Sequence, residues 1–166
     1  MIKRIILPIL IVFTFKGCTK DDICPPDTAT TAKVVIAFND FANPANTKNV
    51  NVLSVQTDYE NPVEVISFEN TKEIAIPLST TSDTTKYKFI RTTFRTNDTL
   101  TNIDKVMFVY RRQNDYVNRA CGFKTEFHNL DADLEQEGGT GNWIKQVTVI
   151  RETVNDENSA HITMLH

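Results

Sequence analysis

The sequence is short of the residues that many catalytic and cofactor sites require. Its 166 residues include only 5 Gly, 3 His, 3 Cys and 1 Trp. So few glycines leave little material for a phosphate-binding loop, and three histidines leave little for a multi-histidine metal centre. We therefore expect neither a cofactor nor a metal site.

Clustered positive charge is also missing. The chain carries 18 Lys and Arg against 21 Asp and Glu, a formal net charge of −3. Nucleic-acid binding needs clustered basic residues to neutralise phosphates, so we expect no nucleic-acid partner. An apolar fraction of 40% fits neither a multispan membrane protein nor a disordered chain, and the length suits one domain.

What the chain does have begins with an N-terminal apolar run. Lys3 and Arg4 precede a stretch over 5–15 that only Pro8 and Thr14 interrupt. Eleven helical residues rise about 16 Å, too little to cross a bilayer core of roughly 30 Å. A short apolar run behind basic residues is typical of a secretory signal peptide.

The run closes on Phe15-Lys16-Gly17-Cys18, which resembles a lipoprotein signal. In such signals a small residue, here Gly17, precedes a cysteine that is lipidated and becomes the new N-terminus. Phe15 and Lys16 depart from the usual Leu and Ala or Ser. The resemblance predicts a leader over 1–17 and lipidation of Cys18. The alternative is a plain secretory leader, with Cys18 an ordinary thiol.

The next residues, Thr19-Lys20-Asp21-Asp22, resemble the surface-export signal of Bacteroidota lipoproteins. The alternative is a solvated tether that happens to be charged. We expect an outer-membrane lipoprotein that is either exposed on the cell surface or faces the periplasm.

The two remaining cysteines suit a disulfide. If Cys18 carries lipid, Cys24 and Cys121 are left as a pair in an oxidising compartment. A bridge between them would close a loop of about 100 residues, worth up to about 4.7 kcal/mol in the chain-entropy model. The alternative is a reactive Cys121 with His128 nearby in sequence. We favour the disulfide, because no cysteine-protease signature surrounds Cys121.

Residues 18–33 are polar and predict a lipidated tether, and residues 34–166 predict one β domain. Apolar and polar side chains alternate there with period two, in short runs separated by Asn-, Asp- and Pro-rich turns. The sequence predicts an all-β, antiparallel sandwich of about seven to nine strands. The expected strands are 34–39, 50–57, 63–68, 73–79, 86–95, 103–111, 118–128, 143–152 and 160–165. We expect Pro77 at a sheet edge or strand end, and a long loop over 129–142.

Aromatic residues could line a sugar or peptide groove, but core packing is the favoured interpretation for Phe89, Phe108 and Phe123. Trp143 follows Gly-Asn and is the best candidate for an exposed aromatic. His161 lies in a strand pattern, which predicts that it is a structural histidine rather than a metal ligand.

Acidic residues alternate near the expected loop. An EF-hand would need glycine at the sixth position from Asp131, where Gln136 stands, so a solvated acidic segment is favoured over a calcium site. The alternating acids are Asp131, Asp133, Glu135 and Glu137.

Three triplets resemble the Asp-Ser/Thr-apolar pattern of O-glycosylation in exported Bacteroidota proteins. Their candidate acceptors, Thr28, Thr84 and Thr99, fall in the predicted tether or in predicted turns.

Several blocks together resemble a domain-of-unknown-function family of small Bacteroidota lipoproteins. The most specific runs from Arg119 to Thr125 (Arg-Ala-Cys-Gly-Phe-Lys-Thr), and others are Cys18–Cys24, Asp83–Lys86 and Asn158–His161. The resemblance implies an exported lipoprotein and a pairing of Cys24 with Cys121. It implies no activity.

We expect a non-enzymatic binding or accessory module of the cell envelope. It would be anchored to the membrane by its lipid and would contact an outer-membrane protein, a glycan or a peptide. The sequence does not indicate an oligomeric state. The alternative is a small envelope hydrolase whose carboxylates converge from separate strands.

Overall fold

The computed structural model describes residues 23–96, 98–138 and 141–166. The predicted leader, Cys18 and the charged residues 20–22 lie outside the described residues. Among the residues described, no helix is long and apolar enough to span a membrane. The described residues form nine strands: β1 (Val34–Asn39), β2 (Val50–Thr57), β3 (Glu64–Thr71), β4 (Glu73–Ile76), β5 (Thr84–Arg95), β6 (Asp98–Asn118), β7 (Gly122–Leu134), β8 (Gln146–Val149) and β9 (Ile162–Leu165).

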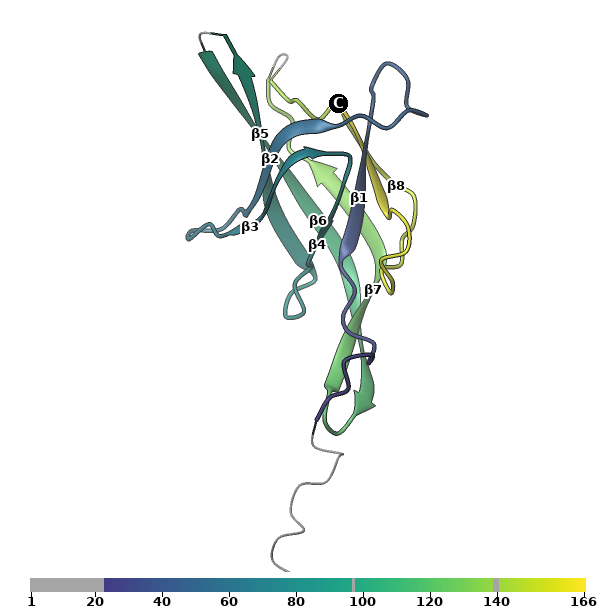
Figure 1. The fold of residues 1–166 in the computed structure, drawn as a ribbon. Coiled ribbons are helices and arrows are strands. Elements are labelled where there is room, and N and C mark those ends of the chain that lie inside the picture. The colour runs from purple at the N-terminus through teal and green to yellow at the C-terminus, as the bar shows by residue number, and fades with distance from the viewer. Residues whose placement is uncertain (1–22, 97, 139–140) are drawn as a thin grey trace, which may run out of the picture. The chain divides into compact units, whose positions relative to one another are not determined.

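The strands form two sheets, ordered β4-β1-β9-β8 and β3-β2-β5-β6-β7 (Figure 1). This arrangement confirms the predicted all-β sandwich, at the upper end of the expected strand number. The β1–β9 pair is parallel, with Ile36 opposite Ile162, whereas β1–β4 and β8–β9 are antiparallel. A parallel pair needs a long connection, and β1 and β9 come from opposite ends of the domain. Pro77 directly follows the edge strand β4, as expected.

One cluster of buried apolar side chains joins the two sheets. It takes Ile36 and Phe38 from β1, Phe89 from β5 and Phe108 from β6, all fully buried. Inward and outward residues alternate along β5 and β6, so period two carries these side chains to one face. Because both sheets contribute to one core, they pack face to face.

The expected loop over 129–142 is wrong in its first half, because β7 continues to Leu134. Leu130 and Leu134 are buried, whereas Asp131 and Asp133 between them are exposed. Asp131 and Asp133, the first half of the acidic run, therefore lie on the solvent face of a strand, and Glu135 and Glu137 follow its end. The leucines on either side follow period two, but the charged residues between them made this segment look like a loop.

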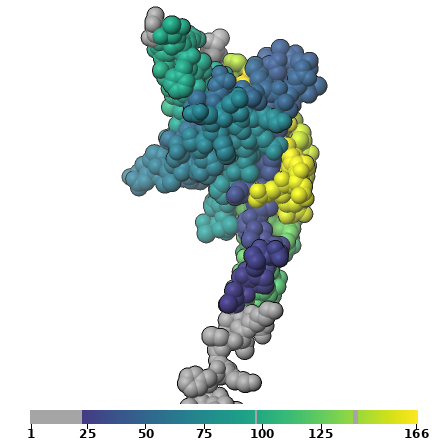
Figure 2. Space-filling view, in the orientation of Figure 1, coloured from purple at the N-terminus to yellow at the C-terminus, as the bar shows by residue number. Residues whose placement is uncertain are grey.

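The chain divides into two compact units. The sandwich unit comprises residues 31–114 and 125–166. The hairpin unit comprises residues 115–124, where β6 turns into β7, and the N-terminal segment, described for residues 23–30. In the sandwich unit, the far end of the β5–β6 hairpin projects at the upper left of Figure 2, in teal.

Candidate functional site

The hairpin unit is built around a tight turn that carries Cys121. The side-chain oxygen of Asn118 accepts hydrogen bonds from the backbone N–H groups of Ala120 (2.9 Å) and Cys121 (2.8 Å). Gly122 then adopts a φ of +72°, a left-handed conformation that glycine enters without side-chain strain. Together these residues close the turn and position Cys121.

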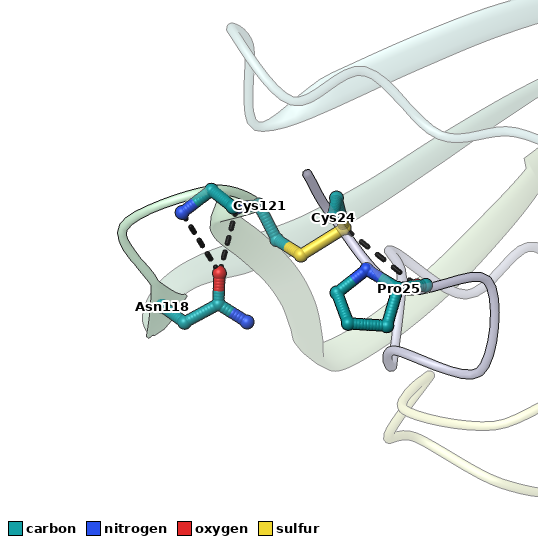
Figure 3. Close-up of a disulfide and its surroundings, with 5 residues drawn as sticks. Cys24, Pro25, Asn118 and Cys121 are labelled. Carbon is teal, nitrogen blue, oxygen red and sulfur yellow. Dashed lines mark hydrogen bonds between the residues drawn. A yellow bond between two sulfur atoms is a disulfide. The ribbon is translucent and has the colours of Figure 1, made fainter. Parts of the chain in front are cut away.

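Cys121 forms a disulfide with Cys24 (Figure 3). The two Cα atoms are 4.9 Å apart, within the range that a bridge requires. A bonded sulfur is no thiolate nucleophile, so the alternative of a reactive Cys121 is wrong. After Cys24 the chain turns, and the N–H of Thr28 donates to the carbonyl of Pro25 at 3.1 Å.

Two aromatic side chains of the hairpin unit are exposed. The rings of Tyr116 and Phe123 meet edge to face, with centroids 5.4 Å apart, and the residues are 63% and 68% exposed. The expectation that Phe123 fills the core is wrong. Phe123 has the same strand parity as the buried Phe127, but it belongs to the hairpin unit and not to the sandwich that buries Phe127. We call Tyr116 and Phe123 the aromatic pair.

The three candidate glycosylation residues lie in different surroundings. Thr28 is in the turn after Cys24, where its N–H donates to the carbonyl of Pro25. Thr84 and Thr99 were expected in turns but are strand residues, the first of β5 and the second of β6. Thr99 is exposed, whereas Thr84 is half-buried and its hydroxyl lies 3.3 Å from that of Ser82. Glycosylation at all three stays a prediction.

A hollow of about 530 Å³ in the sandwich unit is lined largely by hydroxyl groups, including those of Tyr59, Ser79, Thr84 and Tyr87. Most of these groups already have partners inside the protein. The Tyr87 hydroxyl donates to the carbonyl of Pro77 at 2.6 Å, and burial raises the pKa of Tyr87 to about 12. The lining thus fixes the connection between β4 and β5.

A second hollow, of about 240 Å³, gathers three carboxylates: Asp58, Asp133 and Glu135. Lys105 Nζ lies 3.8 Å from Asp58 and 3.7 Å from Glu135, and Lys88 Nζ lies 3.0 Å from Asp58. Hydrolysis of a glycoside needs one protonated carboxyl group beside a charged one. Here lysines accompany the carboxylates, an arrangement that suits an ion-pair network. The hydrolase alternative stays a prediction.

Sequence reasoning missed one buried carboxyl group, that of Asp104. The residue is fully buried, and its Oδ2 accepts a hydrogen bond from the N–H of Ile144 at 2.6 Å. Burial raises the pKa of Asp104, although that hydrogen bond acts in the opposite direction. Asp104 has the same strand parity as the buried Val106 and Phe108, so the period-two pattern of β6 contained the signal.

Trp143, which directly precedes Ile144, is buried, so the expectation of an exposed Trp143 is wrong. The residue is only 2% exposed, and its indole N–H donates to the carbonyl of Phe89 at 3.0 Å. The guanidinium of Arg91 stacks on the indole ring, 5.1 Å from its centroid. The tryptophan is therefore part of the sandwich core.

His161 is fully buried, which confirms its predicted structural role. Its Nδ1 accepts a hydrogen bond from the N–H of Val35 at 3.0 Å, so the neutral ring carries its proton on Nε2. Burial is the main cause of its lowered pKa. Within residues 23–96, 98–138 and 141–166, no group of three or more His, Cys, Asp or Glu could hold a metal ion.

Comparison with known proteins finds one family. Residues 49–166 match a family of unknown function, DUF6452. No curated protein and no solved structure matches the chain. The matched region runs from the start of β2 through β9 and includes Cys121.

Proposed function

The chain belongs to the DUF6452 family of unknown function, and from that premise we propose that it is an exported lipoprotein of the Bacteroidota cell envelope. It is anchored to the outer membrane through Cys18 and acts as a non-enzymatic binding or accessory module. The observation that carries the proposal is the disulfide between Cys24 and Cys121. Disulfides persist in oxidising compartments outside the cytosol, and Cys18, at the end of the apolar run, is the third cysteine of the sequence.

The anchor is supported by the energetics of acyl burial. Each buried methylene contributes about 0.8 kcal/mol, so a cysteine that carries several acyl chains stays at the membrane. Beyond the anchor, Cys24 follows Cys18 by only six positions, so the link from the lipid to the disulfide is short.

The binding role is supported by apolar side chains that the fold leaves exposed. Near the free end of the β5–β6 hairpin, Phe94 is 70% exposed and Leu100 is 44% exposed. Exposed apolar side chains held by a rigid scaffold suit contact with a partner. The partner would be an outer-membrane protein, a glycan or a peptide.

Metabolic labelling with a fatty acid tests the anchor. The parent chain should incorporate label and sediment with membranes, whereas the Cys18→Ala variant should lose both properties. The matched control is the double variant Cys24→Ser with Cys121→Ser, which removes the other two cysteines and should keep the label. A Cys18→Ala variant that stays labelled and membrane-bound would contradict the lipoprotein assignment.

Site-specific photocrosslinking in cells tests the binding role. A photoreactive phenylalanine analogue at position 94 should give one defined adduct. The matched control is position 41, where Phe41 is 54% exposed elsewhere in the sandwich unit. Equal adduct patterns at both positions, or none at position 94, would count against a binding module that uses this hairpin.

A further inference from the structure

We propose that the hairpin unit contacts the bilayer directly, with the aromatic pair in the interfacial layer of the membrane that holds the chain's own lipid. The ligand is the headgroup and glycerol region of that membrane. This inference rests on the lipidation of Cys18 proposed above. It gives the hairpin unit a second membrane contact in addition to the acyl chains.

The length of the tether limits how far the hairpin unit can lie from the membrane. Cys24 follows Cys18 by only six residues, which span roughly 20 Å even when fully extended. The disulfide joins Cys24 to the hairpin turn at Cys121, so the turn cannot leave the bilayer surface by much more than that length. Because the tie is covalent, this limit holds for any arrangement of the sandwich unit.

The side chains that the disulfide keeps near the bilayer surface suit the membrane interface. Tyr116 and Phe123 lie five and two residues from Cys121, and both are about two-thirds exposed. Tyrosine combines an apolar ring with a polar tip, which suits the boundary between lipid and water. Ile23, directly before Cys24, is 74% exposed and adds apolar surface to the same unit.

The net charge of the hairpin unit decides what kind of membrane contact it can make. The described residues of the hairpin unit carry two basic side chains, Arg119 and Lys124, and two acidic ones, Asp27 and Asp115. With no excess of positive charge, attraction to anionic lipid cannot drive the contact. The contact should therefore persist on zwitterionic lipid and at high salt.

Depth-dependent fluorescence quenching tests the proposal on the full-length lipidated protein, reconstituted into phosphatidylcholine vesicles. Tryptophan replaces Phe123 in one variant and Phe94 in the matched control, since the two phenylalanines are 68% and 70% exposed. Trp143 is buried and common to both variants, so the parent protein supplies the background. The variant Tyr116→Trp provides a second reporter for the aromatic pair.

The expected result is selective quenching by phosphatidylcholine that carries a nitroxide near its glycerol end. Emission of the tryptophan at position 123 should fall by roughly half, as expected for a side chain in the interface, and that at position 94 should not change. The loss of emission should be the same in about 0.5 M salt, a concentration that screens surface charges.

Three results would overturn the inference. Reporters at positions 123 and 116 that escape the nitroxide but remain open to aqueous iodide would show that the aromatic pair faces water. Equal quenching at position 94 would show that the hairpin unit is not the selective contact. Spectral changes without nitroxide quenching that grow with the protein-to-lipid ratio would assign the face to a second copy of the chain.

Flotation of the same vesicles separates this inference from the proposal on which it rests. Parent protein that floats with lipid while its reporters stay unquenched would refute the hairpin contact and leave the lipoprotein assignment intact. Parent protein that fails to float would refute both.

Discussion

Removing the disulfide should cost the protein about 2 kcal/mol, well below the value that its loop length alone suggests. The perturbation is the double variant Cys24→Ser with Cys121→Ser, because a single substitution would leave a reactive thiol. The cysteines are 97 residues apart in sequence, and closing a loop of that size in the unfolded chain is worth about 4.7 kcal/mol.

The folded protein without the bridge regains much of that entropy. Thr31 and Thr125 remain tied, because the N–H of Thr125 donates to the hydroxyl of Thr31 at 2.9 Å. Only the chain from Cys24 to Thr31 and from Cys121 to Thr125, about eleven residues, is then released. The net effect scales as (3/2)RT times the logarithm of the ratio of the two loop lengths, which is about 2 kcal/mol.

Urea unfolding, followed by circular dichroism, measures this difference. Both chains should carry Cys18→Ala, so that the proposed lipid is absent from both. A loss near 5 kcal/mol would show that the contacts from Thr31 onward do not survive without the bridge, and would refute the short-loop reasoning. An unchanged free energy of unfolding would refute the claim that the bridge constrains the unfolded chain.

Three further predictions concern single side chains of the sandwich unit. In His161→Leu, the buried N–H of Val35 loses its acceptor, so the free energy of unfolding at pH 7.5 should fall by about 1–3 kcal/mol. Because the pKa of His161 is lowered in the folded protein, the parent should lose stability as the pH falls below the ordinary histidine pKa. If the variant lost the same stability over this pH range, His161 would not be the group responsible. For Asp104→Asn the pH dependence has the opposite sign, because the folded protein raises the pKa of Asp104 and so disfavours its charged form. Thermal unfolding should therefore show that the stability of the parent relative to the variant increases from pH 7 to pH 4. A difference that does not change with pH would contradict this. Arg112→Ala removes donors to Asp83 Oδ1 (2.6 Å) and the Thr80 carbonyl, so amide hydrogen exchange over 79–83 should accelerate while that over β9 stays unchanged.

Alternation of apolar and polar residues predicted the fold well, because strands with one buried face obey period two. The expected spans 34–39 and 50–57 coincide with β1 and β2. The alternation did not predict the full length of β6, which was expected only over 103–111. Period two arises when one face of a strand is buried, and the exposed end of β6 in the hairpin unit has no buried face.

The side-chain predictions failed where tertiary packing decides the environment. Phe123 and Trp143 were assigned opposite environments from those the structure shows, since composition and local neighbours do not reveal which strand residues extend past the core. Asp104 was overlooked because a charged side chain is not expected inside. Its burial depends on the N–H of Ile144, which lies 40 residues away along the chain.

The parallel pairing of β1 with β9 has a consequence for the order of folding. Val35 meets His161 across 126 residues, so the sheet that contains β1 cannot close until nearly the last described strand has been delivered. Contacts this distant in sequence slow folding, because the chain must lose loop entropy before it gains packing. For a chain that we propose is exported, late closure keeps the polypeptide unfolded during passage across the inner membrane. A chain truncated before residue 161 would leave the parallel-pairing edge of β1 open, an exposed strand edge suited to aggregation and proteolysis.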